Sequence, residues 1–135
     1  KIEDLSQVLE LHKTIIPFAI SSDKAFEIYN EMLSNENYFC SVAKENEEII
    51  GSAIGICCKT LAVPFLVIED VVVKEGVRGK GVGGKLMESL DSFAERKNCA
   101  YAILVSSDFR KKAHEFYENH GFTDSVRGFR KVYYR

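Results

Sequence analysis

Apolar side chains in the first third of the chain recur at the three- and four-residue spacing of amphipathic helices. Residues 4–16 follow this period, and Asp4 or Ser6 is suited to cap the start of the helix. A second helix is predicted to begin near Ser21, because the apolar positions after it again lie on one helical face: Ala25, Phe26, Tyr29, Met32 and Leu33. The sequence therefore predicts two helices before the first strand.

The next segment changes to the pattern of β-strands. Residues 37–45 and 48–59 are predicted to be two strands that meet at a short polar turn. Residues 65–73 form a long run of β-branched side chains, which is typical of a buried central strand. Two carboxylates, Glu69 and Asp70, interrupt this run, and an unpartnered carboxylate in such a place is costly.

The second half of the chain alternates helices and strands. After a glycine-rich loop, a helical stripe of apolar residues is followed by a predicted strand at 100–105. Residues 109–120 again have helical spacing, and Gly121 suits the end of that helix. Residues 129–134 predict a last strand. This order of elements is typical of a mixed α/β layer fold.

Composition narrows the function classes. The 135 residues predict a single domain over residues 1–135, and the formal net charge of −2 argues against a nucleic-acid partner, which needs a basic excess. No apolar run approaches the ~18 residues of a membrane helix, so no membrane partner is expected. The cysteines lack C-x-x-C spacing and are interpreted as reduced thiols of a cytoplasmic protein. The histidines lack metal-ligand spacing, so no metal is expected.

Four glycines lie between the valine-rich strand and the next helix: Gly79, Gly81, Gly83 and Gly84. Glycine lets the backbone approach a ligand closely, and a helix start presents free N–H groups and a positive dipole end. With Arg78 and Lys80 beside it, the loop predicts a pyrophosphate site. The spacing also fits a dinucleotide fingerprint, but too few βα units follow. A P-loop would need a hydroxyl where Leu86 stands.

The segment Arg78-x-x-Gly81-x-Gly83 resembles the signature of the GNAT superfamily of acetyl-CoA-dependent N-acetyltransferases. Residues 110–122 resemble the family's later helix, with its tyrosine and closing Gly-Phe pair. The resemblance implies a mixed, mostly antiparallel central sheet with helices on both faces, splayed at the two central strands. The family's first strand has no room before Asp4, so it is expected to be missing from this chain.

The resemblance also implies which residues hold acetyl-CoA. The main chain of the central strand would bind the pantetheine arm and polarise the thioester carbonyl, and the glycine loop would receive the pyrophosphate. The implied cofactor-binding residues are Val71, Val72, Val73, Arg78, Gly79, Lys80, Gly81, Val82, Gly83, Gly84, Ser106 and Arg110. Arg110 departs from the family, because many members have an asparagine at this position.

Tyr117 aligns with the family's general acid, which protonates the leaving thiolate. The alternative is a core tyrosine on an amphipathic stripe. Glu69 is the first candidate for the general base and Asp70 the second, although either could be a structural carboxylate. Because alternate residues of a strand share a face, Glu69 is expected to lie with Val71 and Val73.

The function implied by the resemblance is direct transfer of the acetyl group from acetyl-CoA to a primary amine of a small molecule in a ternary complex. Two alternatives stay open: an acetyltransferase for lysines or N-termini of proteins and peptides, and a non-catalytic coenzyme A-binding sensor. Many relatives dimerise through sheet edges or C-terminal strands, so a homodimer is a further possibility.

Overall fold

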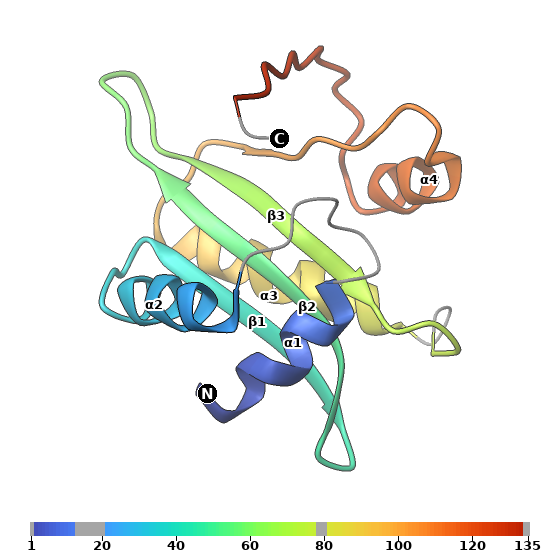
Figure 1. The fold of residues 1–135 in the computed structure, drawn as a ribbon. Coiled ribbons are helices and arrows are strands. Elements are labelled where there is room, and N and C mark those ends of the chain that lie inside the picture. Colours follow the sequence, from blue (N-terminus) through green and yellow to red (C-terminus); the bar gives the residue numbers. More distant parts are fainter. Residues whose placement is uncertain (1, 13–20, 78–80, 134–135) are drawn as a thin grey trace.

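A four-stranded sheet with the strand order β1-β2-β3-β4 lies at the centre of the molecule (Figure 1). The strands β1 (Tyr38–Glu45), β2 (Glu48–Cys58) and β3 (Phe65–Val73) are antiparallel neighbours, and the short β4 (Ala102–Ile103) runs parallel to β3. The computed structural model describes residues 2–12, 21–77 and 81–133. The predicted mixed, mostly antiparallel sheet is confirmed.

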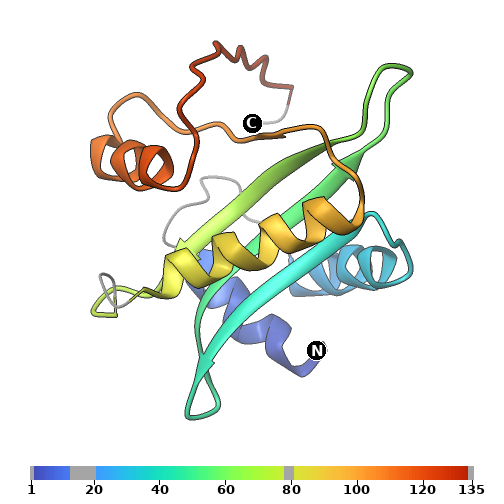
Figure 2. The ribbon, with the colours of Figure 1, turned by 180° about the vertical axis from the view of Figure 1, so that it is seen from behind.

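Helices cover both faces of this sheet. On one face lie the 3-10 turn η1 (Ile2–Asp4), α1 (Leu5–His12) and α2 (Ser22–Leu33), and on the other lies α3 (Val82–Arg96), as the two opposite views show (Figures 1 and 2). The last helix, α4 (Lys111–Asn119), lies beyond β3 (Figure 1). The helix expected over residues 4–16 is confirmed up to His12, and its remainder lies outside the described residues.

The turn between β1 and β2 has two residues in the left-handed region, Asn46 with φ 51° and Glu47 with φ 69°. Glu45 pairs with Glu48 across it. Positive φ at both central residues defines the type I′ turn, whose twist matches that of the flanking strands. This turn therefore joins the two predicted strands at the predicted place.

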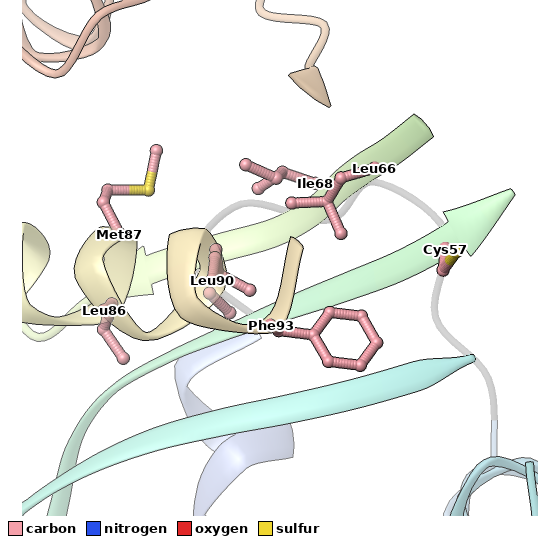
Figure 3. Packing of buried hydrophobic residues seen from close by; sticks show 8 residues of the cluster. Cys57, Leu66, Ile68, Leu86, Met87, Leu90 and Phe93 are labelled. Carbon is pink, nitrogen blue, oxygen red and sulfur yellow. The ribbon is translucent and has the colours of Figure 1, made fainter. Parts of the chain in front are cut away.

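The hydrophobic core lies between the sheet and α3 (Figure 3). Its buried members come from β2, β3 and α3: Ala53, Cys57, Leu66, Ile68, Leu86, Met87, Leu90 and Phe93. Leu66 and Leu90 are both 0% exposed. A Cβ on Gly55 would lie 2.9 Å from Cδ2 of Leu90, so a glycine at this point lets α3 approach the sheet closely.

The ladder between β2 and β3 contains a bulge at Asp70. The register shifts between Ser52 and Ile54, so β3 carries one residue more than β2 there. Asp70 takes a φ of 53°, which is in the left-handed region. This conformation costs a non-glycine residue about 1–2 kcal/mol, although aspartate tolerates it better than most. Bulges of this kind re-aim side chains and are over-represented beside active sites.

The bulge changes which side chains share a face of β3. Strict alternation predicts Glu69 together with Val71 and Val73, and this prediction is wrong. Val71 and Val73 pack against the core under α3, whereas Glu69 lies in register with Ile54, on the face covered by α1 and α2. The alternation restarts after the extra residue, so the valines move to the opposite side of the sheet.

Two strand predictions near the end of the chain are corrected. The apolar run 100–105 is a strand only over β4, and residues 129–133 are irregular, while residue 134 lies outside the described part. Within the described ranges no ladder with β3 continues beyond Ile103. Among the described residues the tail pairs with no strand, and an unpaired strand would leave its backbone groups to solvent.

Candidate functional site

The N-terminus of α3 is open to an anion. Gly81 is the N-cap residue with φ 81°, it provides no side-chain cap, and the first helical turn contains no acidic residue. Its carbonyl accepts the N–H of Lys85, while the N–H groups of the first turn have no partner within the helix. These groups and the helix dipole favour a phosphate. The predicted ligands Arg78, Gly79 and Lys80 lie outside the described residues.

The next two glycines have a packing role that the sequence did not reveal. A Cβ on Gly83 would lie 2.9 Å from Cζ of the Phe116 ring, and a Cβ on Gly84 would lie 3.2 Å from Nε2 of His120. Contacts under 3.0 Å force a neighbour to move, so a side chain on Gly83 would displace the Phe116 ring where α4 meets α3. The glycine motif thus serves both the open helix start and the junction of the two helices.

β3 and β4 pair over only two positions, Leu66 with Ala102 and Val67 with Ile103. The second half of β3, which contains the predicted contacts Val71, Val72 and Val73, has no ladder with β4. Ser106, three residues after the end of β4, has a buried Oγ with no hydrogen-bond partner among the described residues. Because buried hydroxyls are nearly always bonded, this atom is consistent with a ligand that supplies the missing partner. The predicted splay thus lies next to α3's N-terminus.

Tyr117 lies on α4 and packs against the core beneath α3, between the rings of Phe116 and Phe122. Burial raises the pKa of its phenol, and the positive charge of Arg110 opposes that rise. The phenol is therefore protonated near neutral pH, which a proton donor requires. Arg110 is the N-cap residue of α4, near enough to the phenol for its charge to act there.

The α1/α2 face carries the two carboxylates. Burial raises the pKa of Glu69, and the neighbouring Asp70 raises it further. The charge of Asp70 also acts on His12 and on Cys40, which pairs with Ile54 on that face. The bulge therefore brings both candidate bases to one side of the sheet. A carboxyl with a raised pKa is the better proton acceptor near neutral pH.

Sequence reasoning missed His12 as a member of this face. Its Nε2 lies 3.3 Å from Oγ of Ser52 on β2, and both side chains are buried. Burial lowers the pKa of His12, and Asp70 opposes that effect. The available signal was a titratable residue on the apolar stripe of α1, but the stripe alone does not reveal what it faces.

Two kinds of site are not found among the described residues. No group of three or more histidine, cysteine, aspartate or glutamate side chains is arranged to hold a metal ion within the described ranges. Likewise, none of the helices in this part of the chain is long and apolar enough to cross a membrane.

The sheet opens between β3 and β4, and the first turn of α3 beside the opening has no acidic residue. The resemblance to acetyl-CoA-dependent transferases implied an opening at this place. The profile of the acetyltransferase (GNAT) family matches residues 5–122 of the chain. The chain belongs to this family. The match contains both motifs, so the predicted family and enzyme class are confirmed.

Individual relatives agree with this assignment. Thialysine N-epsilon-acetyltransferase of Sus scrofa is 35% identical over 57 residues, which are 42% of this chain and 34% of that protein, so the match spans about a third of that relative. The structure of glucosamine-6-phosphate N-acetyltransferase from Arabidopsis thaliana has a TM-score of 0.87 at 24% identity and covers 98% of this chain and 94% of its own.

A third relative was solved together with acetyl-CoA. This predicted acetyltransferase from Clostridium acetobutylicum has a TM-score of 0.80 at 19% identity, with 98% of this chain and 92% of that chain covered. The two solved structures are less than 25% identical to this chain, so their similarity shows the shared fold.

Proposed function

We propose that this chain transfers the acetyl group of acetyl-CoA directly to a primary amine of a small molecule in a ternary complex. One observation carries the proposal: acid-base groups of two kinds flank the opening beside β3 from opposite faces of the sheet. Tyr117 belongs to the α3 side, and Glu69 and Asp70 belong to the α1/α2 side. A thioester between the diverging strands would be accessible from both sides.

The pyrophosphate would bind at the start of α3. Main-chain N–H groups of the first turn would bind it, and the side chains of the preceding loop would add charge-assisted contacts. The residues proposed for this role are Arg78, Gly79, Lys80, Gly81, Val82, Gly83 and Gly84. The bare N-terminus of α3 and its lack of acidic residues in the first turn support this assignment.

The pantetheine arm would lie along the second half of β3, where the ladder with β4 has ended. Backbone groups of residues 71–73 would bind the arm like an added strand, and one N–H would polarise the thioester carbonyl. The buried hydroxyl of Ser106, which has no partner among the described residues, would form a hydrogen bond with the same ligand. Arg110, at the start of α4, is exposed and would reach a phosphate.

The chemistry would then need one base and one acid. The acceptor nitrogen attacks the carbonyl carbon, and the carbon–sulfur bond breaks. Glu69 or Asp70 accepts the proton that the amine loses, and the Tyr117 phenol donates a proton to the departing thiolate. The raised pKa of Glu69 and the protonated state of Tyr117 fit these two roles.

The acceptor is proposed to be a small molecule, because relatives of this chain act on such amines. Thialysine and glucosamine-6-phosphate, which appear in the names of two relatives, both carry a primary amine. The test is acetyl-CoA consumption with a panel of diamines, amino acids, amino sugars, aminoglycosides and lysine peptides. Turnover only with peptides would replace the small-molecule acceptor, and tight cofactor binding with no turnover would favour a sensor.

Tyr117→Phe tests the mechanism within that assay. Turnover is expected to fall by about 10²- to 10⁴-fold, because the leaving thiolate loses its proton donor. The dissociation constant for acetyl-CoA, measured by calorimetry, should stay unchanged. Tyr101→Phe is the control, since Tyr101 is 51% exposed and its ring, which the variant keeps, stacks on Phe65. Full turnover of Tyr117→Phe with saturating substrates would remove this residue from the mechanism.

We also propose that the chain forms a homodimer through its C-terminal segment. Phe129 and Tyr133, 89% and 86% exposed, lie in the irregular tail and would become buried in such a contact. Size-exclusion chromatography with light scattering measures the mass of the protein directly. A monomeric mass at all concentrations would contradict the dimer.

A further inference from the structure

The family motifs assign no role to His12, yet this residue lies near Asp70, one of the two candidate bases. It is the last residue of α1 and is only 9% exposed. Its Nε2 and Oγ of Ser52 share a hydrogen bond of 3.3 Å, and the register shift that produces the bulge begins at Ser52. Asp70, the bulged residue, is near enough for its charge to act on the imidazole. Groups from α1, β2 and β3 therefore meet here.

We propose that His12 is a positioning residue for acceptor deprotonation. Held by Ser52, it braces the bulge that brings Asp70 and Glu69 to one face, and it places a neutral imidazole beside their charges. This inference rests on the acetyl transfer proposed above. His12 acts through the carboxylates, while the proton of the acceptor amine goes to one of them.

The bulge needs support of this kind. The left-handed conformation of Asp70 costs about 1–2 kcal/mol, and such strained residues persist only where the surrounding structure holds them. The helix α1 contacts both β2 and β3 (Figure 1), so its end is placed to resist relaxation of the bulge. Ser52 ties that end to β2, next to the shifted register.

The ionisation of His12 fits the same role. Burial lowers its pKa and the charge of Asp70 raises it, so the imidazole is neutral near pH 7. A neutral ring does not compete with an incoming ammonium for the carboxylates. Among the described residues, the other titratable groups on this face include Glu69 from β3, Cys40 from β1, Tyr29 from α2 and the ion pair of Asp4 in η1 with Lys44 in β1. Burial raises the pKa of the Cys40 thiol and of the Tyr29 phenol. Once protonated in acid, His12 would favour the ionised form of the carboxylates.

The first experiment compares two residues that both tie α1 to β2. The side chain of Gln7 accepts the N–H of Ile49 at 2.9 Å, away from the bulge. His12→Ala is expected to lower kcat/KM for the acceptor by about 10- to 100-fold, because small misplacements of catalytic groups are costly. KM for acetyl-CoA should stay unchanged. Gln7→Ala should lower the melting temperature but keep the kinetics of the wild type.

His12→Gln is the rescue variant, because its amide nitrogen replaces Nε2 and preserves the bond to Ser52. It should recover most of the loss at neutral pH. The ratio of its kcat/KM to that of the wild type should fall as the pH drops through the pKa of His12, since the variant lacks the cation that keeps Asp70 and Glu69 ionised. The titration of the acceptor itself cancels in this ratio. Equal kinetic losses in His12→Ala and Gln7→Ala, or a flat ratio, would overturn the proposal.

An NMR titration of the imidazole tests the coupling without any turnover. In the wild type, His12 should titrate below 6.5, and in Asp70→Asn its pKa should fall further, because the charge that raises it is gone. If the protein acetylated no amine at all, the proposed function would fail while this measurement still decided whether His12 and Asp70 interact. An unchanged pKa in Asp70→Asn would contradict the inference.

Discussion

The face of the sheet under α3 is closed and apolar, whereas the face under α1 and α2 carries titratable groups. On the α3 side, Leu66 and Leu90 are fully buried within one continuous cluster. On the other side, Asp70 lies near His12 and Glu69, and burial together with the charge of Asp70 shifts the pKa of both groups. One face thus holds the main core, and the other carries both candidate bases.

The difference shows how a single strand serves both purposes. Charges on the α3 side would be desolvated without partners, at a cost of several kcal/mol. The bulge at Asp70 resolves this conflict, because it turns Val71 and Val73 toward the core while Glu69 stays on the opposite face. The strained backbone at Asp70 thus places both carboxylates on the α1/α2 face.

The largest expected effect is a loss of stability on the α3 side. Leu90→Ala should lower the free energy of unfolding by about 3 kcal/mol, within the range of about 2–5 for buried leucines. Ile54→Ala is the matched control on the half-buried opposite face and should cost clearly less. Urea unfolding measures both. Equal losses would mean that the two faces contribute alike to the fold.

On the α1/α2 side the loss should appear in activity. Glu69→Gln is expected to lower kcat/KM at pH 7 by about 100-fold and to remove the acidic limb of the pH-rate profile, if Glu69 is the base. Asp70→Asn keeps a residue that tolerates the positive φ, so the variant with the larger loss identifies the base. Retention of the wild-type acidic limb in Glu69→Gln would exclude Glu69.

Glu69→Gln should be no less stable than the wild type. The folded state raises the pKa of Glu69 above its usual 4.5. Its contribution to stability is therefore present below that value and is lost as the pH rises through the folded pKa. At pH 7 the folded protein holds an unfavourable charge that glutamine lacks, so calorimetry should give an equal or slightly higher melting temperature. Glu45→Gln is the control at the exposed end of β1, and it should change neither the melting temperature nor kcat/KM.

A loss of stability smaller than that of Leu90→Ala is expected at the junction of α3 and α4. Gly83→Ala should destabilise the protein by about 1 kcal/mol and raise KM for acetyl-CoA, because the new methyl group meets the Phe116 ring. Gly84→Ala is the control for stability alone, because Gly84 is itself proposed to bind the pyrophosphate. Its methyl group meets only the end of the exposed His120 side chain. Equal losses of stability in the two variants would mean that the contact with the Phe116 ring does not matter.

Much of the fold was predictable because its signals are local. The helical periods of α2 and α3 and the β-branched run of β3 were expected from residues next to one another, and the structure places these elements there. The turn at Asn46 and the positive φ of Gly121 were equally local. Tail residues 129–133 were mispredicted, because whether a segment becomes a strand depends on a partner edge that lies elsewhere in the chain.

The candidate site was predictable as a set of residues but not as an arrangement. The motifs named Tyr117, Glu69 and Asp70, whereas His12 entered only when α1 was seen to end against Ser52. The face of Glu69 was predicted wrongly, since period-two alternation assumes an unbroken ladder. A bulge becomes visible only when β2 and β3 are paired.

The sequence by itself determined the family, the order of the elements up to α4 and the glycine-rich start of α3, since these depend on residue type and spacing along the chain. The tertiary structure decided which side chains share a face, which ring a side chain on Gly83 would meet, and which groups surround the carboxylates. These features depend on segments distant in sequence, and the contact of His12 with Ser52 spans 40 positions. The periodicity of a helix or a strand cannot predict a contact between residues so far apart in the sequence.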